Sequence, residues 1–292
     1  MLRGIHVPLV TPFTSSGEVA VDAVEKLARH VLDEGAAGLV ALGTTGEVVA
    51  LDAGERALVI ETCARVCAER EALLTVGVTG NDTRSTAQAL RELPDGVGAA
   101  LVTVPYILRP GERGVVAHFE ELAEASPVPL VIYHIPYRTG QTVGAATLRE
   151  LGEHPRIAGV KYAVGGIDQD TIDLLADLPE GFEVLAGDDP FVSPLLALGA
   201  SGGILASAHV LTRSFVELAD AWQAGDVAAA RPLGHRLARV SRALFAEPNP
   251  TVLKGLLHAR GLIPTPDVRL PLLPASADAV SQADLVAVHP GQ

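Results

Sequence analysis

The stretch Ile157-Ala158-Gly159-Val160-Lys161 is a short apolar run that ends on a lysine. Four apolar residues are too few for a helix and are typical of a strand that is buried on both faces. Lysine is rare in this chain, since only Lys26, Lys161 and Lys254 of the 22 basic residues are lysines. Lys26 lies on the polar side of a predicted helix and Lys254 lies in another helical run. Only Lys161 is therefore predicted to stand where burial of a charge is costly.

A lysine at the end of a buried strand would lose its hydration, which favours the neutral amine over the ammonium. A neutral amine can act as a nucleophile. The alternative is a lysine that reaches the surface or pairs with a carboxylate. Because arginine supplies almost every other cation in the chain, we interpret Lys161 as a functional nucleophile.

Runs of the same kind recur along the chain at intervals of about 20 to 35 residues and alternate with amphipathic helical stretches. The eight runs cover residues 5–10, 38–42, 73–78, 99–104, 130–133, 157–161, 182–187 and 202–206. Asp22 with Glu25, and Asp52 with Glu55, have the spacing of a helix capping box. Eight successive βα units predict a closed parallel (β/α)8 barrel, or TIM barrel. An open doubly wound sheet is the alternative, but no dinucleotide-type glycine fingerprint follows the first run.

The pattern changes after the eighth run. Residues 214–224, 226–245 and 251–260 form helical patterns with no strand between them, and a last helix is expected from Ser276. We therefore expect a catalytic barrel of residues 1–224 and a C-terminal helical domain of residues 225–292.

Composition excludes several classes of partner. The net charge of −13 argues against nucleic acid and against an anionic membrane surface. No apolar run approaches the length of a membrane-spanning helix. The first residues lack the pattern of a signal peptide, so we expect a cytoplasmic protein.

The cysteine and histidine side chains, which often bind metals, are not expected to do so here. Cys63 and Cys67 lie four apart on a predicted helix and are expected to be small buried thiols. His134 and His209 have no partner at ligand spacing, so we expect no metal site.

Catalytic groups of an eight-stranded barrel lie at the C-terminal ends of its strands. The second run leads into Gly43-Thr44-Thr45-Gly46-Glu47, a turn that can offer backbone N–H groups and hydroxyls to an anionic oxygen. The fifth run ends at Tyr133, which could carry protons or simply fill space. Arg138 is a candidate clamp for a carboxylate, or an exposed loop arginine. In Gly187-Asp188-Asp189 the carboxylates could accept hydrogen bonds from hydroxyls or cap a helix.

On these residues the chain resembles the dihydrodipicolinate synthase / N-acetylneuraminate lyase family of pyruvate-handling class I aldolases. The resemblance extends from Val7-Pro8-Leu9-Val10-Thr11-Pro12-Phe13 to Glu247-Pro248-Asn249-Pro250. Two segments carry it: Gly38-Leu39-Val40-Ala41-Leu42-Gly43-Thr44-Thr45-Gly46-Glu47, and the segment from Tyr133-His134-Ile135-Pro136 to Gly159-Val160-Lys161. It implies a (β/α)8 barrel with a C-terminal helical extension, no cofactor, and assembly as a homotetramer or homodimer.

The resemblance also implies a mechanism. The amine of Lys161 would form a Schiff base with pyruvate, and the resulting enamine would attack a small aldehyde or arise from a 2-keto acid. Tyr133 would carry the proton, and Thr44 would orient the Tyr133 side chain. The remaining family positions would bind substrate and correspond here to Thr45, Gly43, Arg138, Ile204 through its main-chain carbonyl, and Gly187.

The chain departs from the synthase branch of this family at several positions. That branch has two adjacent tyrosines after its fourth strand, the second of which reaches the neighbouring subunit's site, whereas this chain has Tyr106-Ile107. Isoleucine cannot pass a proton, although the pyruvate chemistry itself needs only Lys161 and Tyr133. We predict a dihydrodipicolinate synthase-like enzyme. The alternatives are an aldolase of the N-acetylneuraminate, keto-deoxy sugar acid or 4-hydroxy-2-oxoglutarate type, and a 2-keto acid-binding paralogue with little turnover.

Regulation by lysine is not expected from the sequence. Lysine-inhibited members bind lysine at a dimer interface with polar residues that include histidine and glutamate. The corresponding positions here are Val48, Ala53, Arg56 and Ser85, which lack the anionic partner for a lysine ammonium, although Asn81 and Tyr106 of that site remain.

Overall fold

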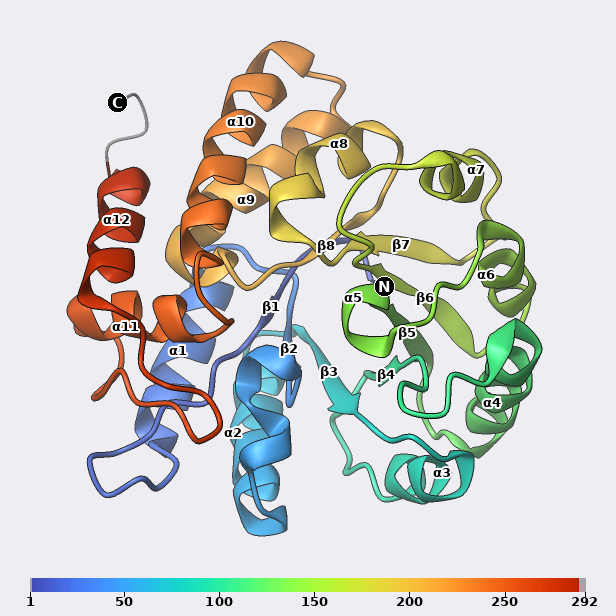
Figure 1. The fold of residues 1–292 in the computed structure, drawn as a ribbon, viewed down its shortest axis with the longest axis horizontal. Coiled ribbons are helices and arrows are strands. Elements are labelled where there is room, and N and C mark those ends of the chain that lie inside the picture. Colours follow the sequence, from blue (N-terminus) through green and yellow to red (C-terminus); the bar gives the residue numbers. More distant parts are fainter. Residues whose placement is uncertain (1, 289–292) are drawn as a thin grey trace.

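The computed structural model describes residues 2–288, and its centre is a closed barrel of eight parallel strands surrounded by helices (Figure 1). The strands are β1 (Gly4–Pro8), β2 (Gly38–Ala41), β3 (Leu73–Val78), β4 (Ala99–Thr103), β5 (Leu130–His134), β6 (Ile157–Tyr162), β7 (Glu183–Ala186) and β8 (Gly202–Ile204). Each strand pairs with the next along the chain, and β8 pairs with β1. The predicted (β/α)8 barrel is confirmed.

Helices connect the strands and extend the chain beyond them. Those of the barrel are α1 (Val21–Asp33), α2 (Ala53–Glu69), α3 (Thr83–Arg91), α4 (Gly111–Ala125), α5 (Pro136–Thr139), α6 (Ala145–Gly152), α7 (Gln169–Ala176), α8 (Val192–Ala197) and α9 (Ala208–Gln223). The extension holds α10 (Val227–Leu244), α11 (Thr251–Ala259) and α12 (Ala277–Val288), and short 3-10 turns are η1 (Thr44–Gly46), η2 (Val48–Ala50) and η3 (Asp189–Phe191). None of the helices within residues 2–288 is long and apolar enough to cross a membrane.

The strands separate two apolar cores because their side chains alternate between the two faces. On β5, Val131 and Tyr133 face the barrel interior, whereas Ile132 packs among the helices outside. Close strand contact leaves no room for a side chain at Gly159, where a Cβ atom would stand 2.2 Å from the carbonyl oxygen of Glu183. The glycine in the run that ends on Lys161 is thus required by the packing of β6 against β7.

One of the two predicted capping boxes is present. The side chain of Asp52 accepts a hydrogen bond from the Glu55 amide at 2.9 Å, and Glu55 accepts one in return from the Asp52 amide. The prediction for Asp22 and Glu25 is wrong, because α1 has Ala20 at its N-cap and no side-chain cap. Glu25 forms ion pairs with arginines of α1 and α2 instead.

The C-terminal extension packs directly on the barrel. Helix α10 lies against α8 and α9, and α12 lies against α10 and α11 (Figure 1). The predicted boundary at Gly225 falls in the short link between α9 and α10. The division into residues 1–224 and 225–292 stays a prediction.

The cysteines behave as predicted, and His209 has a structural role. Cys63 and Cys67 are free and buried, and burial raises the pKa of the Cys67 thiol to about 12.

The ring of His209 accepts a hydrogen bond from the Val10 amide at 3.2 Å through Nε2, and its Nδ1 lies 2.8 Å from the carbonyl oxygen of Ala206. Among the described residues, no group of three histidine, cysteine or acidic side chains could hold a metal ion.

His134 is buried without partners. It follows Tyr133 on β5 but faces the outer core, where its ring centroid lies 5.7 Å from that of Tyr162. Neither ring nitrogen has a hydrogen-bond partner. Burial lowers the pKa of His134 to about 4, although the charges of Asp168 and Glu112 oppose the shift. Protonation of this side chain therefore favours the unfolded chain.

We predict that His134→Leu makes the protein less sensitive to acid. The unfolded imidazole titrates near its ordinary pKa of 6.5 and the folded one near 4, so the folded state loses stability as pH falls through this window and loses none above it. When the pH is lowered from about 7.5 to about 5, the unfolding free energy of the variant should rise by about 2 kcal/mol relative to that of the native protein. Urea unfolding of both proteins at the two pH values measures this, and a difference that does not change with pH contradicts the assignment.

Candidate active site

A cavity of about 530 Å³ lies where the C-terminal ends of the strands meet. Seven of the eight predicted site residues line it: Thr44, Thr45, Tyr133, Arg138, Lys161, Gly187 and Ile204. Gly43 is buried directly beside this lining as the N-cap residue of η1. Barrel closure thus gathers residues that are far apart in the sequence.

Lys161 and Tyr133 form the floor of this cavity. They lie opposite each other in the parallel pairing of β5 and β6, and each is 7% exposed. Lys161 Nζ lies 4.4 Å from the centroid of the Tyr133 ring. A Cβ atom on Gly187 would stand 2.9 Å from Lys161 Cγ, so glycine at this position makes room for the lysine side chain.

Lys161 is buried without an ion pair. Among the ion pairs of residues 2–288, none joins a carboxylate to Lys161 Nζ within 4.0 Å. A lysine amine that faces a cavity and lacks a carboxylate partner is available to react with a carbonyl compound. Among the described residues, Lys161 therefore neither reaches the surface nor pairs with a carboxylate, which were the two alternatives to a functional role.

The Thr44–Thr45 turn is joined to the C-terminal extension. Asn249 Nδ2, in the link between α10 and α11, donates a hydrogen bond of 3.0 Å to Thr45 Oγ1. Glu247 and Pro248 of the same link line the cavity. This link was predicted only as the end of the family resemblance and not as part of the cavity lining.

The two aspartates after β7 have structural partners. Asp188 Oδ2 accepts a hydrogen bond of 2.6 Å from the Gly165 amide, and Asp189 Oδ2 accepts one of 2.6 Å from the Ser207 amide. Burial raises the pKa of both carboxyls, that of Asp189 to about 6. Neither side chain caps η3. The helix-capping interpretation is therefore wrong, and these carboxylates hold neighbouring loops in place.

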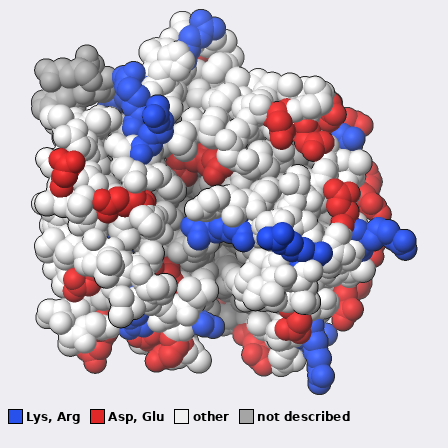
Figure 2. All heavy atoms as spheres, viewed as in Figure 1, with Lys and Arg blue, Asp and Glu red and all other residues white. Residues whose placement is uncertain are grey.

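The rim of the cavity carries exposed side chains of α5. Tyr137 is 91% exposed, and Arg138 beside it is also exposed. Lys and Arg side chains gather across the middle of the face in Figure 2, over α5, although the whole chain carries a net charge of −13. An anionic group that approaches this mouth meets positive charge.

The interpretation of Lys254 as an ordinary helical lysine is wrong. Lys254 is 0% exposed, compared with 7% for Lys161. Its Nζ donates to Glu47 Oε1 at 2.8 Å and to the Thr11 carbonyl oxygen at 2.9 Å. The carboxylate-paired alternative that was considered for Lys161 thus applies to Lys254. Its partner lies 207 positions away, which no local pattern reveals.

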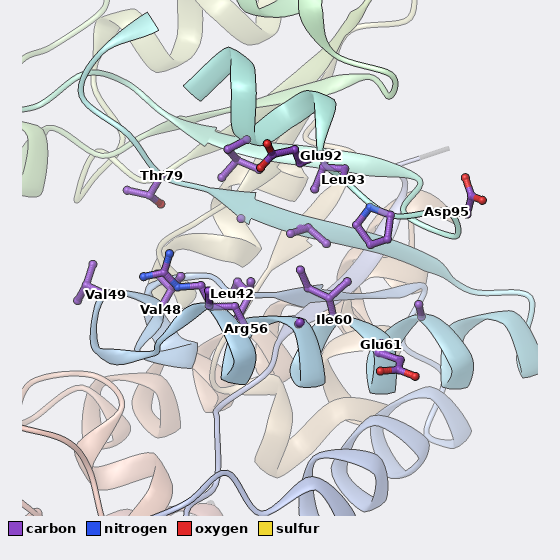
Figure 3. A pocket seen from close by; sticks show the side chains of 18 of the residues that line it. Leu42, Val48, Val49, Arg56, Ile60, Glu61, Thr79, Glu92, Leu93 and Asp95 are labelled. Carbon is purple, nitrogen blue, oxygen red and sulfur yellow. The ribbon is translucent and has the colours of Figure 1, made fainter. Parts of the chain in front are cut away.

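A larger cavity of about 800 Å³ lies outside the barrel between α2 and α3. Figure 3 shows Ile60 projecting from α2 towards Leu93 on the opposite wall, while Arg56 of the same helix extends towards Val48. Three of the four positions predicted for a family lysine site line it, namely Val48, Ala53 and Arg56. Ser85 is not among the lining residues. This larger cavity contains neither Lys161 nor Tyr133, both of which line the smaller one.

Comparisons with known proteins identify the family of this chain. The model of the Dihydrodipicolinate synthetase family matches residues 1–287. The chain is 37% identical over 276 residues to 4-hydroxy-tetrahydrodipicolinate synthase 2 of Clostridium acetobutylicum, which covers 94% of this chain and 96% of that protein. It is 35% identical over 294 residues to the 4-hydroxy-tetrahydrodipicolinate synthase of Neisseria meningitidis serogroup B, which covers 100% of both chains.

Solved structures give the same result. The chloride-inhibited dihydrodipicolinate synthase from Acinetobacter baumannii, complexed with pyruvate, superposes with a TM-score of 0.93 at 32% identity and covers 99% of both chains. The dihydrodipicolinate synthase from Aquifex aeolicus has a TM-score of 0.91 at 32% identity and covers 98% of this chain and 97% of its own. The predicted resemblance is confirmed: the chain belongs to the dihydrodipicolinate synthetase family.

Proposed function

We propose that this chain is a Schiff-base-forming, pyruvate-dependent aldolase of the dihydrodipicolinate synthase type, with Lys161 as its nucleophile. The observation that carries the proposal is the Lys161 amine, which lies in a cavity 4.4 Å from the Tyr133 ring without a carboxylate partner. Membership of the family supports this class of reaction. The Acinetobacter baumannii relative complexed with pyruvate supports pyruvate as the first substrate.

The reaction begins with the Lys161 amine attacking the ketone carbon of pyruvate. Loss of water gives a protonated imine, which withdraws electrons so that a methyl proton can leave and an enamine forms. Tyr133, beside Lys161, carries protons in these steps. The enamine carbon then bonds to the carbonyl carbon of an aldehyde, and in reverse the same intermediate results from cleavage of a 2-keto acid.

Binding of the two substrates is divided between the floor and the mouth of the cavity. Thr45 and the backbone N–H groups around Gly43 and Thr44 hold the pyruvate carboxylate, with Thr44 also orienting Tyr133. The carbonyl group of Ile204 contacts the bound intermediate. Arg138 at the mouth binds an anionic group of the second substrate.

Assembly into a homodimer or homotetramer is part of the proposal. Ile107 and Leu108, on the link after β4, are 76% and 71% exposed. The Ile107 amide donates to Asn81 Oδ1 at 3.3 Å, so the link is held with these apolar side chains facing outward. Adjacent exposed apolar side chains of this size mark an interface more often than a free surface.

A second candidate is an aldolase of another branch that cleaves or forms a different 2-keto acid. Ile107 favours it, since no proton-transferring side chain stands there. A paralogue that binds 2-keto acids with little turnover is the third candidate, and it would bind pyruvate without covalent attachment.

Borohydride reduction in the presence of pyruvate tests the nucleophile. We expect the mass of one reduced pyruvate adduct on Lys161, located by peptide mass spectrometry. Lys161→Arg should fold but form no adduct, because a guanidinium stays protonated. Adduct on another residue, or none on the native protein, contradicts the proposed aldolase.

The residue at position 107 distinguishes the synthase from other aldolases. General acid–base assistance is worth about 10²–10⁴-fold, so we expect the native chain to be a slow synthase with aspartate semialdehyde while pyruvate deuterium exchange persists. Ile107→Tyr should raise synthase turnover if any single change does. Native turnover equal to that of relatives with a tyrosine, and unaffected by Tyr106→Phe, would overturn this expectation.

We also predict that L-lysine does not regulate this protein. Val48 and Ala53 are apolar, and Arg56 repels an ammonium group at the positions that a lysine site requires. Titration with L-lysine up to the millimolar range should leave the initial rate of pyruvate deuterium exchange unchanged. Saturable inhibition would show that the larger cavity still binds lysine.

A further inference from the structure

Glu47 closes the Thr44–Thr45 turn in an unusual backbone conformation. Its φ of 54° and ψ of 33° place it in the left-handed region, which is unfavourable for a residue with a Cβ atom. Glycine or asparagine would tolerate this conformation better. Glutamate is explained at this position by its side chain, which is 1% exposed and ion-paired.

Two separate segments hold the Glu47 carboxylate. Lys254 Nζ of α11 donates to Oε1 at 2.8 Å, and the backbone amide of Arg269 donates to Oε2 at 2.8 Å. Both partners come from the C-terminal extension. Each oxygen of the buried carboxylate therefore has a donor that fixes the position of the turn relative to α11.

Lys254 also contacts the other side of the turn. Its Nζ donates to the Thr11 carbonyl oxygen at 2.9 Å, while Thr11 Oγ1 donates to the Gly46 carbonyl oxygen at 2.7 Å. Gly46 lies so close to β1 that a Cβ atom there would stand 3.0 Å from the Leu9 carbonyl oxygen. A single ammonium thus joins the segment after β1 to the turn after β2.

The ammonium of Lys254 packs against the ring of Phe13. Lys254 Nζ lies 4.1 Å from the ring centroid, and the Arg269 guanidinium lies 4.4 Å from it. With Lys254 0% exposed, removal of either charge would leave the other buried and unpaired. The ion pair is consequently a fixed element of the site and not a mobile surface contact.

We propose that Lys254, acting through Glu47, is a positioning residue that holds the Thr44–Thr45 turn in the shape that receives the pyruvate carboxylate. The inference rests on the proposed function. Lys254 touches no substrate in this arrangement. It sets the orientation of the Thr44 and Thr45 hydroxyls and of the backbone N–H groups beside them, and so determines how well pyruvate is captured and not how Lys161 reacts once it is captured.

The test compares Lys254→Met with Leu256→Ala, a fully buried position on the same helix whose apolar side chain cannot form a hydrogen bond or an ion pair with the turn. Borohydride trapping at a series of pyruvate concentrations gives the half-saturating concentration and the final extent of adduct on Lys161. We expect Lys254→Met to raise the half-saturating concentration about 10- to 100-fold and still reach full adduct. Leu256→Ala should lower the thermal midpoint but leave half-saturation at the native value.

A double variant separates positioning from stability and serves if Lys254→Met does not fold. Glu47→Leu combined with Lys254→Met replaces the ion pair by apolar side chains, which often restores stability. We expect a thermal midpoint near the native one but a half-saturating concentration that stays raised, because no side chain holds the backbone at position 47. Native half-saturation in either variant, or an equal rise in Leu256→Ala, overturns the proposal.

Hydrogen exchange gives a readout that does not depend on the proposed function. The Gly46 and Glu47 amides donate to the carbonyl oxygens of Gly43 and Thr44 at 3.0 and 3.1 Å. In the double variant these two amides should exchange faster than in the native protein. In Leu256→Ala the same two amides should exchange at the native rate. Absence of adduct on the native protein would reject the proposed aldolase. Exchange at the native rate in the double variant would reject the positioning role, whether or not the adduct forms.

Discussion

Closure of the barrel between β1 and β8 determines where the ends of all eight strands lie. Gly4 pairs with Gly202, and a Cβ atom on Gly202 would stand 1.9 Å from the Gly4 carbonyl oxygen. The two strands approach so closely that only glycine fits. Closure leaves no free sheet edge and fixes the register around the ring, including the pair Tyr133 and Lys161. The arrangement of side chains at the strand ends follows from this register.

The closed barrel buries two lysines in different ways. Lys254 is paired with Glu47 at 2.8 Å, so its charge is satisfied and its role is structural. Lys161 faces a cavity and the ring of Tyr133. Burial lowers the pKa of Lys254, while the charge and hydrogen bond of Glu47 oppose that shift. Burial alone therefore does not identify a nucleophile, and the presence or absence of a partner carboxylate decides.

The sequence predicted what short-range patterns encode. Eight apolar runs predicted the barrel, and three of them end on the cavity-lining residues Tyr133, Lys161 and Gly187. Thr44, Thr45 and Arg138 follow such runs, whereas Ile204 was predicted only from the family resemblance. Contacts between distant segments were not predictable in this way. Lys254 and Glu47 are 207 positions apart and Asn249 and Thr45 are 204 apart, so no periodicity or spacing joins them. The missing cap at Asp22 has the same cause, since Glu25 is held by arginine side chains that a local pattern does not reveal.

A crystal structure of the native protein soaked with pyruvate would show whether Lys161 is the nucleophile. We predict continuous density from Lys161 Nζ to the ketone carbon of pyruvate, with the carboxylate against the Thr44–Thr45 turn and the former methyl group towards the mouth of the cavity. Pyruvate bound elsewhere, or bound in this cavity beside an unmodified Lys161, would contradict it.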